Sequence, residues 1–322
     1  MLLSVIIPAY NSEETLGRAI ESVLVQANDE VEVIIINDGS TDNTLKVANK
    51  YANIKNLRIF TTENHGLSSA RNYGIAHSLG NYLAFLDSDD EFENGLIKIF
   101  FEKQNIEKNL DVFLFNHKKV FPNYEVSYPG LNIITNKSDY VLKAILTYGG
   151  LEMYACNKIW KKNLFNDVQF PVGVLYEDMN TVYRLLSMAN QFIISDFEGL
   201  KYYSNPTGIT QSVFTYKQMD LVTQNEVLFN SIISNYKNLS PEYSKLFFLN
   251  IIATANKLTL SKVVNKEIFR EQLIELENNY HNYFYTNPLI STSKKIGWFL
   301  YKHFPEVYRF LYIMFLKIYS KN

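Results

Sequence analysis

Two aspartates separated by one serine, Asp87 and Asp89, directly follow the apolar run 82–86 (YLAFL). The run predicts a buried strand, and side chains two residues apart on an extended segment point the same way, roughly 6.5–7 Å apart. Two carboxylates held together repel each other unless a cation binds, and hard oxygen ligands select Mg²⁺ or Mn²⁺. Because Mg²⁺ keeps positions for substrate phosphates, a nucleoside diphosphate fits such a site. A solvated acidic turn or a helix cap is the alternative interpretation.

Three more polar clusters follow apolar runs that resemble strands. They are Tyr10-Asn11 after 3–7, Asn37-Asp38-Gly39-Ser40 after 31–36, and Glu63-Asn64 after 57–60. The carboxyl ends of parallel strands meet at one edge of a sheet, where α/β proteins bind their ligands. The sequence therefore predicts that all four clusters converge on one rim.

The N-terminal part alternates such strands with amphipathic helices. Helices are expected after an N-cap at Ser12, after Thr41 or Asp42, and over 68–78. Strands and helices that alternate at this spacing predict an α/β fold, in which a mostly parallel sheet has helices on both faces.

Beyond residue 110 the pattern becomes mixed and then helical. Strands are expected at 111–120, 192–195 and 199–203, and helices at 137–146, 178–188, 221–233 and 243–258. A boundary near 205–216 divides the chain into an α/β domain, 1–210, and a C-terminal helical region, 211–322.

The composition excludes several classes of protein. The chain has 322 residues, 47% of them hydrophobic, and 31 basic against 33 acidic residues, a balance that argues against a nucleic-acid binder. The single cysteine, Cys156, allows no disulfide within the chain and no Cys/His zinc cluster, which fits a reducing compartment. The first residues resemble a buried strand rather than a signal peptide, and no apolar window is long enough for a spanning helix.

Four segments together carry a resemblance to a known family. They are SVIIPAYNSEETLGRAIESVLVQ, VIIINDGSTDNT, ENHGLSSARNYGI and YLAFLDSDD. In order and spacing the chain resembles the inverting family 2 glycosyltransferases of GT-A fold over residues 3–100. The similarity continues more loosely to about residue 205, through NKIWKKNLF and LYEDMNTVYRLL. It implies a Rossmann-like nucleotide-diphospho-sugar transferase with a nucleotide-binding half, 1–110, and an acceptor half, 111–210.

The resemblance also implies roles for individual residues. Asp89 would bind the metal directly, with Asp87 nearer to the nucleotide sugar, and Asp38 would accept a hydrogen bond from the base N3–H, which favours uridine. Asp38 would equally suit a tight turn for structural reasons alone. The remaining residues implied in nucleotide-sugar binding are Pro8, Ala9, Tyr10, Asn11, Glu13, Asn64, Gly66, Arg71 and Ser88.

Two of these residues have a second interpretation. Glu13 could serve the start of the following helix electrostatically. Arg71 lies on a helix that opens with Gly66, whose lack of a Cβ permits close approach of a ligand, so a cation there suits a diphosphate. A surface arginine paired with an acidic neighbour is the alternative for Arg71.

Inversion at the sugar requires a base on the face opposite the leaving diphosphate. The pair Glu177-Asp178, at the start of a predicted helix, resembles the family's Glu-Asp element, and Asp178 is the expected general base. An acidic pair that interacts favourably with a helix dipole is the alternative. The chain departs from the family's pattern in 201–212 (KYYSNPTGITQS), where Gly208-Ile209-Thr210 has no arginine beside it. How the diphosphate is held there is therefore open.

The segment 294–321 is rich in lysine, arginine and aromatic residues and contains one acid, Glu306. Such a pattern suits peripheral contact with an anionic membrane, and packing on the catalytic domain or on another subunit of a homo-oligomer is the alternative. The leading hypothesis is an Mn²⁺- or Mg²⁺-dependent cytoplasmic enzyme that transfers a hexose or N-acetylhexosamine from a UDP-sugar to a glycan, polymer or lipid-linked acceptor. This enzyme could act at the inner face of the membrane. A nucleotidyltransferase and a catalytically silent glycan-binding module are the alternatives.

Overall fold

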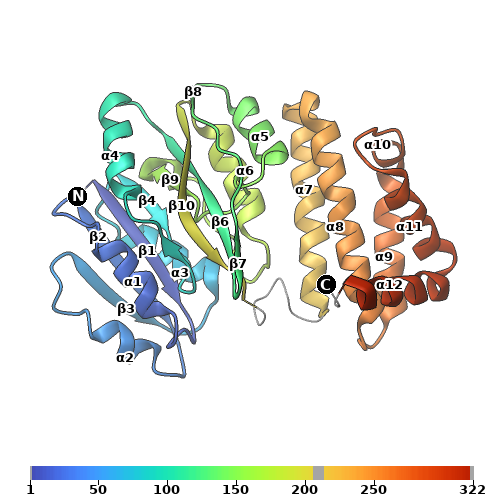
Figure 1. Cartoon of the computed structure of the whole chain (residues 1–322), viewed down its shortest axis with the longest axis horizontal. Coiled ribbons are helices and arrows are strands. Elements are labelled where there is room, and N and C mark those ends of the chain that lie inside the picture. The colour runs from blue at the N-terminus through green and yellow to red at the C-terminus, as the bar shows by residue number, and fades with distance from the viewer. Residues whose placement is uncertain (1, 206–213, 320–322) are drawn as a thin grey trace. The chain divides into compact units, whose positions relative to one another are not determined.

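The computed structural model describes residues 2–205 and 214–319 and divides into two compact units, Met1–Pro206 and Thr207–Asn322. The predicted Gly208-Ile209-Thr210 element lies outside the described residues. Figure 1 shows the strands of the first unit and the helices of the second.

The first unit is built on a ten-stranded sheet. Its strands are β1 (Leu3–Ala9), β2 (Val31–Asp38), β3 (Leu57–Thr62), β4 (Tyr82–Phe85), β5 (Glu91–Phe92), β6 (Val112–Phe121), β7 (Tyr124–Val126), β8 (Ile133–Thr135), β9 (Lys158–Lys161) and β10 (Phe192–Tyr203). The order is β3-β2-β1-β4-β9-β6-β10-β5, with β7 beside β6 and β8 beside β10. The strands β3, β2, β1 and β4 are parallel to one another, as are β6 and β10, while β9 runs antiparallel between the two groups.

The helices of this unit cover both faces of the sheet. They are α1 (Leu16–Leu24), α2 (Thr44–Asn49), α3 (Leu67–His77), α4 (Leu96–Ile106), α5 (Ser138–Thr147) and α6 (Asp178–Met188), with a 3-10 turn, η1 (Lys162–Phe165). On one face α1 and α4 share a core with Val5 and Ile7 of β1. On the other face α3 approaches so closely that a Cβ on Gly74 would lie 2.4 Å from Ile6 Cγ2. The predicted α/β fold with helices on both faces is therefore confirmed.

Several local expectations differ from the structure. The first strand continues through Pro8 and Ala9, because its pairing with β4 ends at Ile6 and Pro8 then lies where no partner on that side needs its N–H. Ser12 does not cap the first helix, which begins at Leu16. The two short strands expected at 192–195 and 199–203 form one strand, β10, whose register with β6 shifts around Glu198.

The second unit is helical. Its helices are α7 (Asp220–Asn235), α8 (Ser240–Leu260), α9 (Lys266–Asn279), α10 (His281–Tyr285), α11 (Thr292–His303) and α12 (Pro305–Tyr319), with two 3-10 turns, η2 (Tyr216–Met219) and η3 (Lys237–Leu239). Phe229, Tyr243, Phe247 and Phe284 are fully buried, and Trp298 is 1% exposed. Aromatic packing of α7, α8, α10 and α11 therefore forms the core of this unit. Among the described helices, none combines the length and the apolar character that crossing a membrane requires.

Candidate active site

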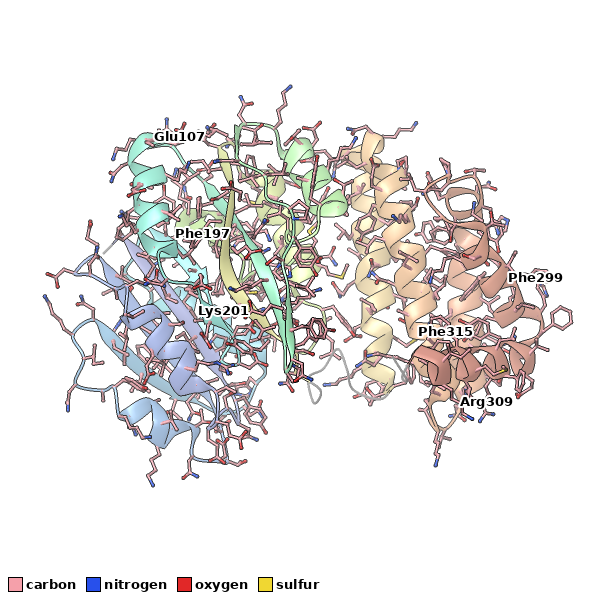
Figure 2. All side chains as sticks on the ribbon, in the orientation of Figure 1. Glu107, Phe197, Lys201, Phe299, Arg309 and Phe315 are labelled. Atoms are coloured by element: carbon pink, nitrogen blue, oxygen red, sulfur yellow. The ribbon has the colours of Figure 1, made fainter. Side chains whose placement is uncertain are left out.

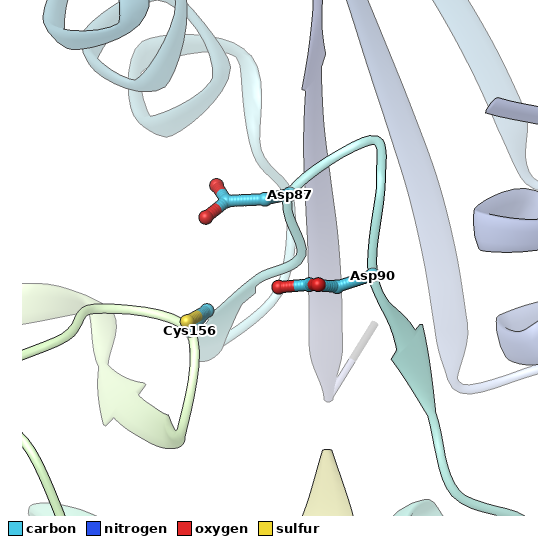
Figure 3. Close-up of side chains that lie close together, drawn as sticks. All are labelled: Asp87, Asp90 and Cys156. Atoms are coloured by element: carbon cyan, nitrogen blue, oxygen red, sulfur yellow. The ribbon is translucent and has the colours of Figure 1, made fainter. Parts of the chain in front are cut away.

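The aspartate motif follows β4, and two of its carboxylates meet a loop from later in the chain. Asp87, Asp90 and Cys156 each offer one ligand atom, and these atoms lie within 4.8 Å of one another (Figure 3). Asp90 Oδ1 accepts a hydrogen bond from the Tyr203 N–H at 2.9 Å, while the buried Oδ2 has no partner. Burial raises the pKa of Asp90 well above its usual value, and the charges of Asp87 and Asp89 raise it further.

These residues fit a divalent cation. An unpartnered buried carboxylate oxygen is costly unless a cation or a proton binds it. Burial also raises the pKa of the Cys156 thiol, so the thiol stays protonated and the carboxylates of Asp87 and Asp90 are the better ligands. Oxygen ligands favour Mg²⁺ or Mn²⁺. No described residue set beyond this one brings three ligand groups of this kind together.

The other two residues of the motif bind neighbouring loops. Asp89 Oδ2 accepts a hydrogen bond from Asn205 Nδ2 at 3.1 Å, and its main-chain oxygen accepts one from Arg18 at 2.5 Å. Burial and the charge of Asp87 raise the pKa of the Asp89 carboxyl. Ser88 Oγ lies 2.7 Å from Ser12 Oγ. The motif is thus attached to the start of the chain and to the end of β10.

Arg71 is buried in the middle of the site. Its side chain is 1% exposed, and its Nη2 lies 2.9 Å from Asp87 Oδ1. Nη1 contacts two more carboxylates, Glu177 Oε1 at 2.8 Å and Asp178 Oδ1 at 2.6 Å. Burial lowers the pKa of Arg71, but the charges of the three carboxylates outweigh burial and raise it. This guanidinium joins Asp87, in the motif that follows β4, to the start of α6.

Asp178 is the first residue of α6, and both of its carboxylate oxygens are held. Arg71 contacts Oδ1, and the Ala155 N–H donates to Oδ2 at 3.1 Å. The side chain remains 17% exposed. Burial raises the pKa of Asp178, Arg71 opposes that shift, and Asp87 adds to it. Burial also raises the pKa of Glu177 to about 7, and the neighbouring charge of Asp178 contributes.

A buried lysine organises the loop that donates to Asp178. Lys158, the first residue of β9, is fully buried. Its Nζ donates to the main-chain oxygens of Glu152 and Tyr154, at 2.6 and 2.8 Å, and to Asn157 Oδ1 at 2.5 Å. Burial lowers the pKa of Lys158 to about 8. Because Ala155 follows Tyr154, this ammonium fixes the loop whose N–H reaches the candidate base.

Asp38 lies at the end of β2 and is 3% exposed. Its carboxylate accepts hydrogen bonds from the main-chain N–H groups of His65, at 3.1 Å, and Gly66, at 2.8 Å. Gly66 has φ +89°, and a Cβ on Gly39 would lie 2.6 Å from Asn64 N. The predicted residues Asp38, Asn64 and Gly66 are therefore brought together, and Asp38 orders the loop that precedes α3.

Tyr10 and Asn11 follow β1. The Tyr10 side chain is 48% exposed, which leaves its ring free for a ligand. Asn11 has φ +47°, and its Oδ1 accepts a hydrogen bond from the Thr41 N–H at 2.9 Å. The loop after β1 is thus tied to the loop after β2.

Glu13 precedes α1 in the sequence, but its carboxylate contacts the segment before α2. Its Oε2 accepts hydrogen bonds from the main-chain N–H and the side-chain amide of Asn43, at 2.8 and 2.7 Å, immediately before α2. Pro8 and Ala9 lie in β1 and are buried. Glu13 therefore orders the segment before α2, and Pro8 and Ala9 belong to the buried strand that precedes Tyr10.

Sequence reasoning did not select Asp90 or Lys158. Asp90 adjoins the motif, so a third acid after the strand was a usable signal. Lys158 gave none, because a lysine is normally placed at the surface. The sequence indicates no role for Glu177 beyond its place beside Asp178. Its contact with Arg71 joins residues 106 positions apart, which sequence patterns do not reveal.

Comparison with known proteins shows the family to which this fold and this rim belong. The sequence profile of Glycosyl transferase family 2 matches residues 4–168, half of the chain. The chain therefore belongs to glycosyl transferase family 2 and is a glycosyltransferase, as the resemblance predicted.

Relatives of the chain include two glycosyltransferases of Streptococcus pneumoniae. GlyA is 28% identical over 233 residues, which cover 67% of this chain and 32% of GlyA. GlyG is 27% identical over 222 residues, which cover 64% of this chain and 72% of GlyG. A cholesterol galactosyltransferase of Borreliella burgdorferi is 26% identical, over 73% of this chain and 71% of the relative.

Solved structures of similar fold include residues 1–349 of S. aureus TarS in complex with UDP-GlcNAc. The two chains superpose with a TM-score of 0.68 and share 23% identity, over 88% of this chain and 81% of TarS 1–349. This likeness shows that the two proteins share a fold.

Proposed function

We propose that this chain is a metal-dependent, inverting transferase that moves a hexose or an N-acetylhexosamine from a UDP-sugar, with Asp178 as general base. One observation carries the proposal: the buried Arg71 joins Asp87, a candidate metal ligand, to Asp178. Inversion requires a proton acceptor on the face of the sugar opposite the leaving diphosphate; Asp178 suits that role, and Asp87 would hold the metal at the diphosphate.

The reaction needs few groups from the chain. Asp87, Asp89 and Asp90 would hold Mg²⁺ or Mn²⁺, which supplies positive charge to a leaving diphosphate. Asp178 accepts the proton of the attacking hydroxyl, and the new glycosidic bond forms as the bond to the diphosphate breaks. The hydrogen bonds from Arg71 and Ala155 orient the carboxylate, and its raised pKa makes it a stronger base than an ordinary aspartate.

UDP as the nucleotide is supported by two considerations. TarS, which shares the fold, was solved with UDP-GlcNAc. In this chain Asp38 Oδ2 accepts one hydrogen bond, from the Gly66 N–H, so the carboxylate keeps acceptor capacity that suits a uracil N3–H donor. We assign the donor to 1–110 and the acceptor to 111–210 within the domain 1–210, and the helical region 211–322 lies outside this chemistry.

The acceptor is a glycan, a cell-surface polymer or a lipid-linked sugar. Relatives include a cholesterol galactosyltransferase and, in Pasteurella multocida, a hyaluronan synthase. The first name specifies a lipid acceptor and the second a glycan product. The family match favours a glycosyltransferase over a nucleotidyltransferase.

The test is release of UDP from a panel of UDP-sugars with and without Mn²⁺. We expect slow, Mn²⁺-dependent hydrolysis of one preferred donor, and Asp178→Asn lowers acceptor-dependent turnover about 10²–10⁴-fold. Asp139→Asn is the matched control, since Asp139 also lies in the first turn of a helix, α5. Binding of UDP without any turnover would instead indicate the silent glycan-binding module. Release of pyrophosphate from a nucleoside triphosphate would indicate the nucleotidyltransferase.

A further inference from the structure

The last helix, α12, carries an apolar stripe that the rest of its unit leaves uncovered. The residues recur at the spacing of one helix face, and each side chain is between 46% and 64% exposed. The stripe consists of Val307, Phe310, Leu311, Met314 and Ile318. A contiguous apolar face of this kind marks a surface that meets a partner or a membrane.

A different face of α12 makes the contacts that hold the helix. Tyr308 donates a hydrogen bond to Asn256 Oδ1, on α8, at 2.5 Å. Its ring also packs edge-on against Tyr301 of α11, with the centroids 5.3 Å apart. Val307, Phe310 and Met314 lie a quarter turn or more around the helix from Tyr308, so this part of the stripe is turned away from the contacts with α8 and α11. The apolar side chains of the stripe are therefore exposed even though α12 is packed against α8 and α11.

The apolar surface continues onto α11. Ile296 and Phe299 are 56% and 49% exposed, and Phe304, between the two helices, is 52% exposed. Figure 2 shows the Phe299 ring pointing away from the helices. The two helices thus present apolar side chains over a broader area than one helix alone.

Basic residues outnumber acidic ones in the segment that carries these apolar residues. Residues 292–319 contain five lysines and arginines and a single acid, Glu306. Lys294 and Arg309 are exposed, and Lys302 is paired with Glu277, 3.2 Å away. Arg309 lies at the end of α12 that carries Phe310 (Figure 2). Long basic side chains can extend from an apolar face to anionic groups beside it.

We infer that α11 and α12 rest in the plane of an anionic lipid surface, with the stripe entering the boundary between head groups and acyl chains. Apolar side chains flanked by lysine and arginine are the chemistry of an interfacial helix. Lys294 and Arg309 meet the phosphate groups of the lipids. Neither helix crosses the bilayer, because no described helix is long and apolar enough.

The charges favour lipid over a second copy of the chain. A twofold contact is isologous and sets the same patch against itself, so the basic residues of two copies would lie close together. The cores of protein interfaces are also depleted in lysine. An anionic lipid surface supplies the opposite charge along the whole face. The inference is independent of the proposed reaction, which takes place in the first unit.

The test is co-sedimentation of the full chain with vesicles of phosphatidylcholine, with or without phosphatidylglycerol. We expect binding that requires the anionic lipid and weakens as salt is added. The double variant Phe310→Ser/Met314→Ser should lower the partition coefficient more than about tenfold. Lys294→Gln should lower it about fivefold.

Ile106→Ser/Val227→Ser is the matched control, because it removes two exposed apolar side chains from other helices, 73% and 51% exposed. It should bind vesicles as the unchanged chain does. Release of UDP by Phe310→Ser/Met314→Ser without vesicles should also be unchanged, which separates this inference from the proposed function. Failure of the full chain to bind anionic vesicles would overturn the inference. So would a dimer, seen by light scattering, that the double variant converts to monomers.

Discussion

Arg71 illustrates how one buried residue can hold a site together. It contacts three carboxylates, and its removal leaves them close together in a region with little water. We expect Arg71→Met to lower the free energy of unfolding by about 3–5 kcal/mol, measured by urea denaturation. Arg71→Met/Glu177→Gln should recover part of that loss, because one of the unpaired charges is gone. Lys55→Met is the control, since the Lys55–Asp29 pair is exposed and should change stability little. Equal stability of Arg71→Met and the control would contradict the role of this cluster.

The raised pKa of Asp178 leads to a prediction about pH. The base must be ionised to accept a proton, so kcat should rise with pH through its pKa. Burial holds that pKa above the ordinary aspartate value, and the acidic limb should therefore lie above about pH 4. Arg71 lowers the pKa of Asp178, so Arg71→Lys, which cannot contact all three carboxylates, should move the limb to higher pH. Release of UDP measured across pH gives both profiles, and a limb that stays at the ordinary value would contradict the assignment.

At the scale of elements, substitution of helical glycines by alanine can test the close packing of α3 on β1. A Cβ on Gly74 would lie 2.4 Å from Ile6 Cγ2, so Gly74→Ala should destabilise the chain by about 1–3 kcal/mol. Gly297, also within a helix, has Tyr308 Cε2 as its nearest neighbour, at 3.9 Å. Gly297→Ala should therefore stabilise the chain by about 0.5–1 kcal/mol. Thermal or urea unfolding measures both, and changes of the same sign would refute the packing argument.

The sequence predicted the elements that show a continuous apolar run or a helical apolar period. The apolar runs before Asp38 and Asp87 and the helix 178–188 are of this kind, and the loops at their ends contact one another. It could not predict β9, because that strand has four residues and its Lys158 is buried. The contact of Arg71 with Glu177 and Asp178 was equally inaccessible, since α3 has no marked amphipathic face and the partners lie more than 100 residues away.

For the whole molecule, the two tryptophans report on different units. Trp160 is fully buried in the first unit, and Trp298 is 1% exposed in the second. Mn²⁺ with UDP should stabilise the first unit, because a ligand that binds only the folded state raises stability. In a Trp298→Phe variant the fluorescence of Trp160 should therefore show a higher unfolding temperature with Mn²⁺ and UDP. A Trp160→Phe variant should show a smaller shift, and no shift in either variant would contradict the metal site.

The same stabilisation should depend on pH. Burial raises the pKa values of Asp89 and Asp90, so protons compete with the metal at a higher pH than they would at ordinary aspartates. The shift caused by Mn²⁺ and UDP should be larger at about pH 8 than at about pH 5. Calorimetry at the two pH values would measure it, and equal shifts would show that these carboxylates do not take part.

The reversed direction of β9 has a further consequence. Along the parallel strands the chain reaches the rim as it leaves each strand, whereas at β9 it reaches the rim on the way in. Residues could be inserted between the end of α5 and Glu152, ahead of the loop that Lys158 holds, without lengthening any crossover helix. Change in that one segment would reshape the surface beside Asp178 while the donor half stayed as it is, a route by which related enzymes could diverge in what they glycosylate.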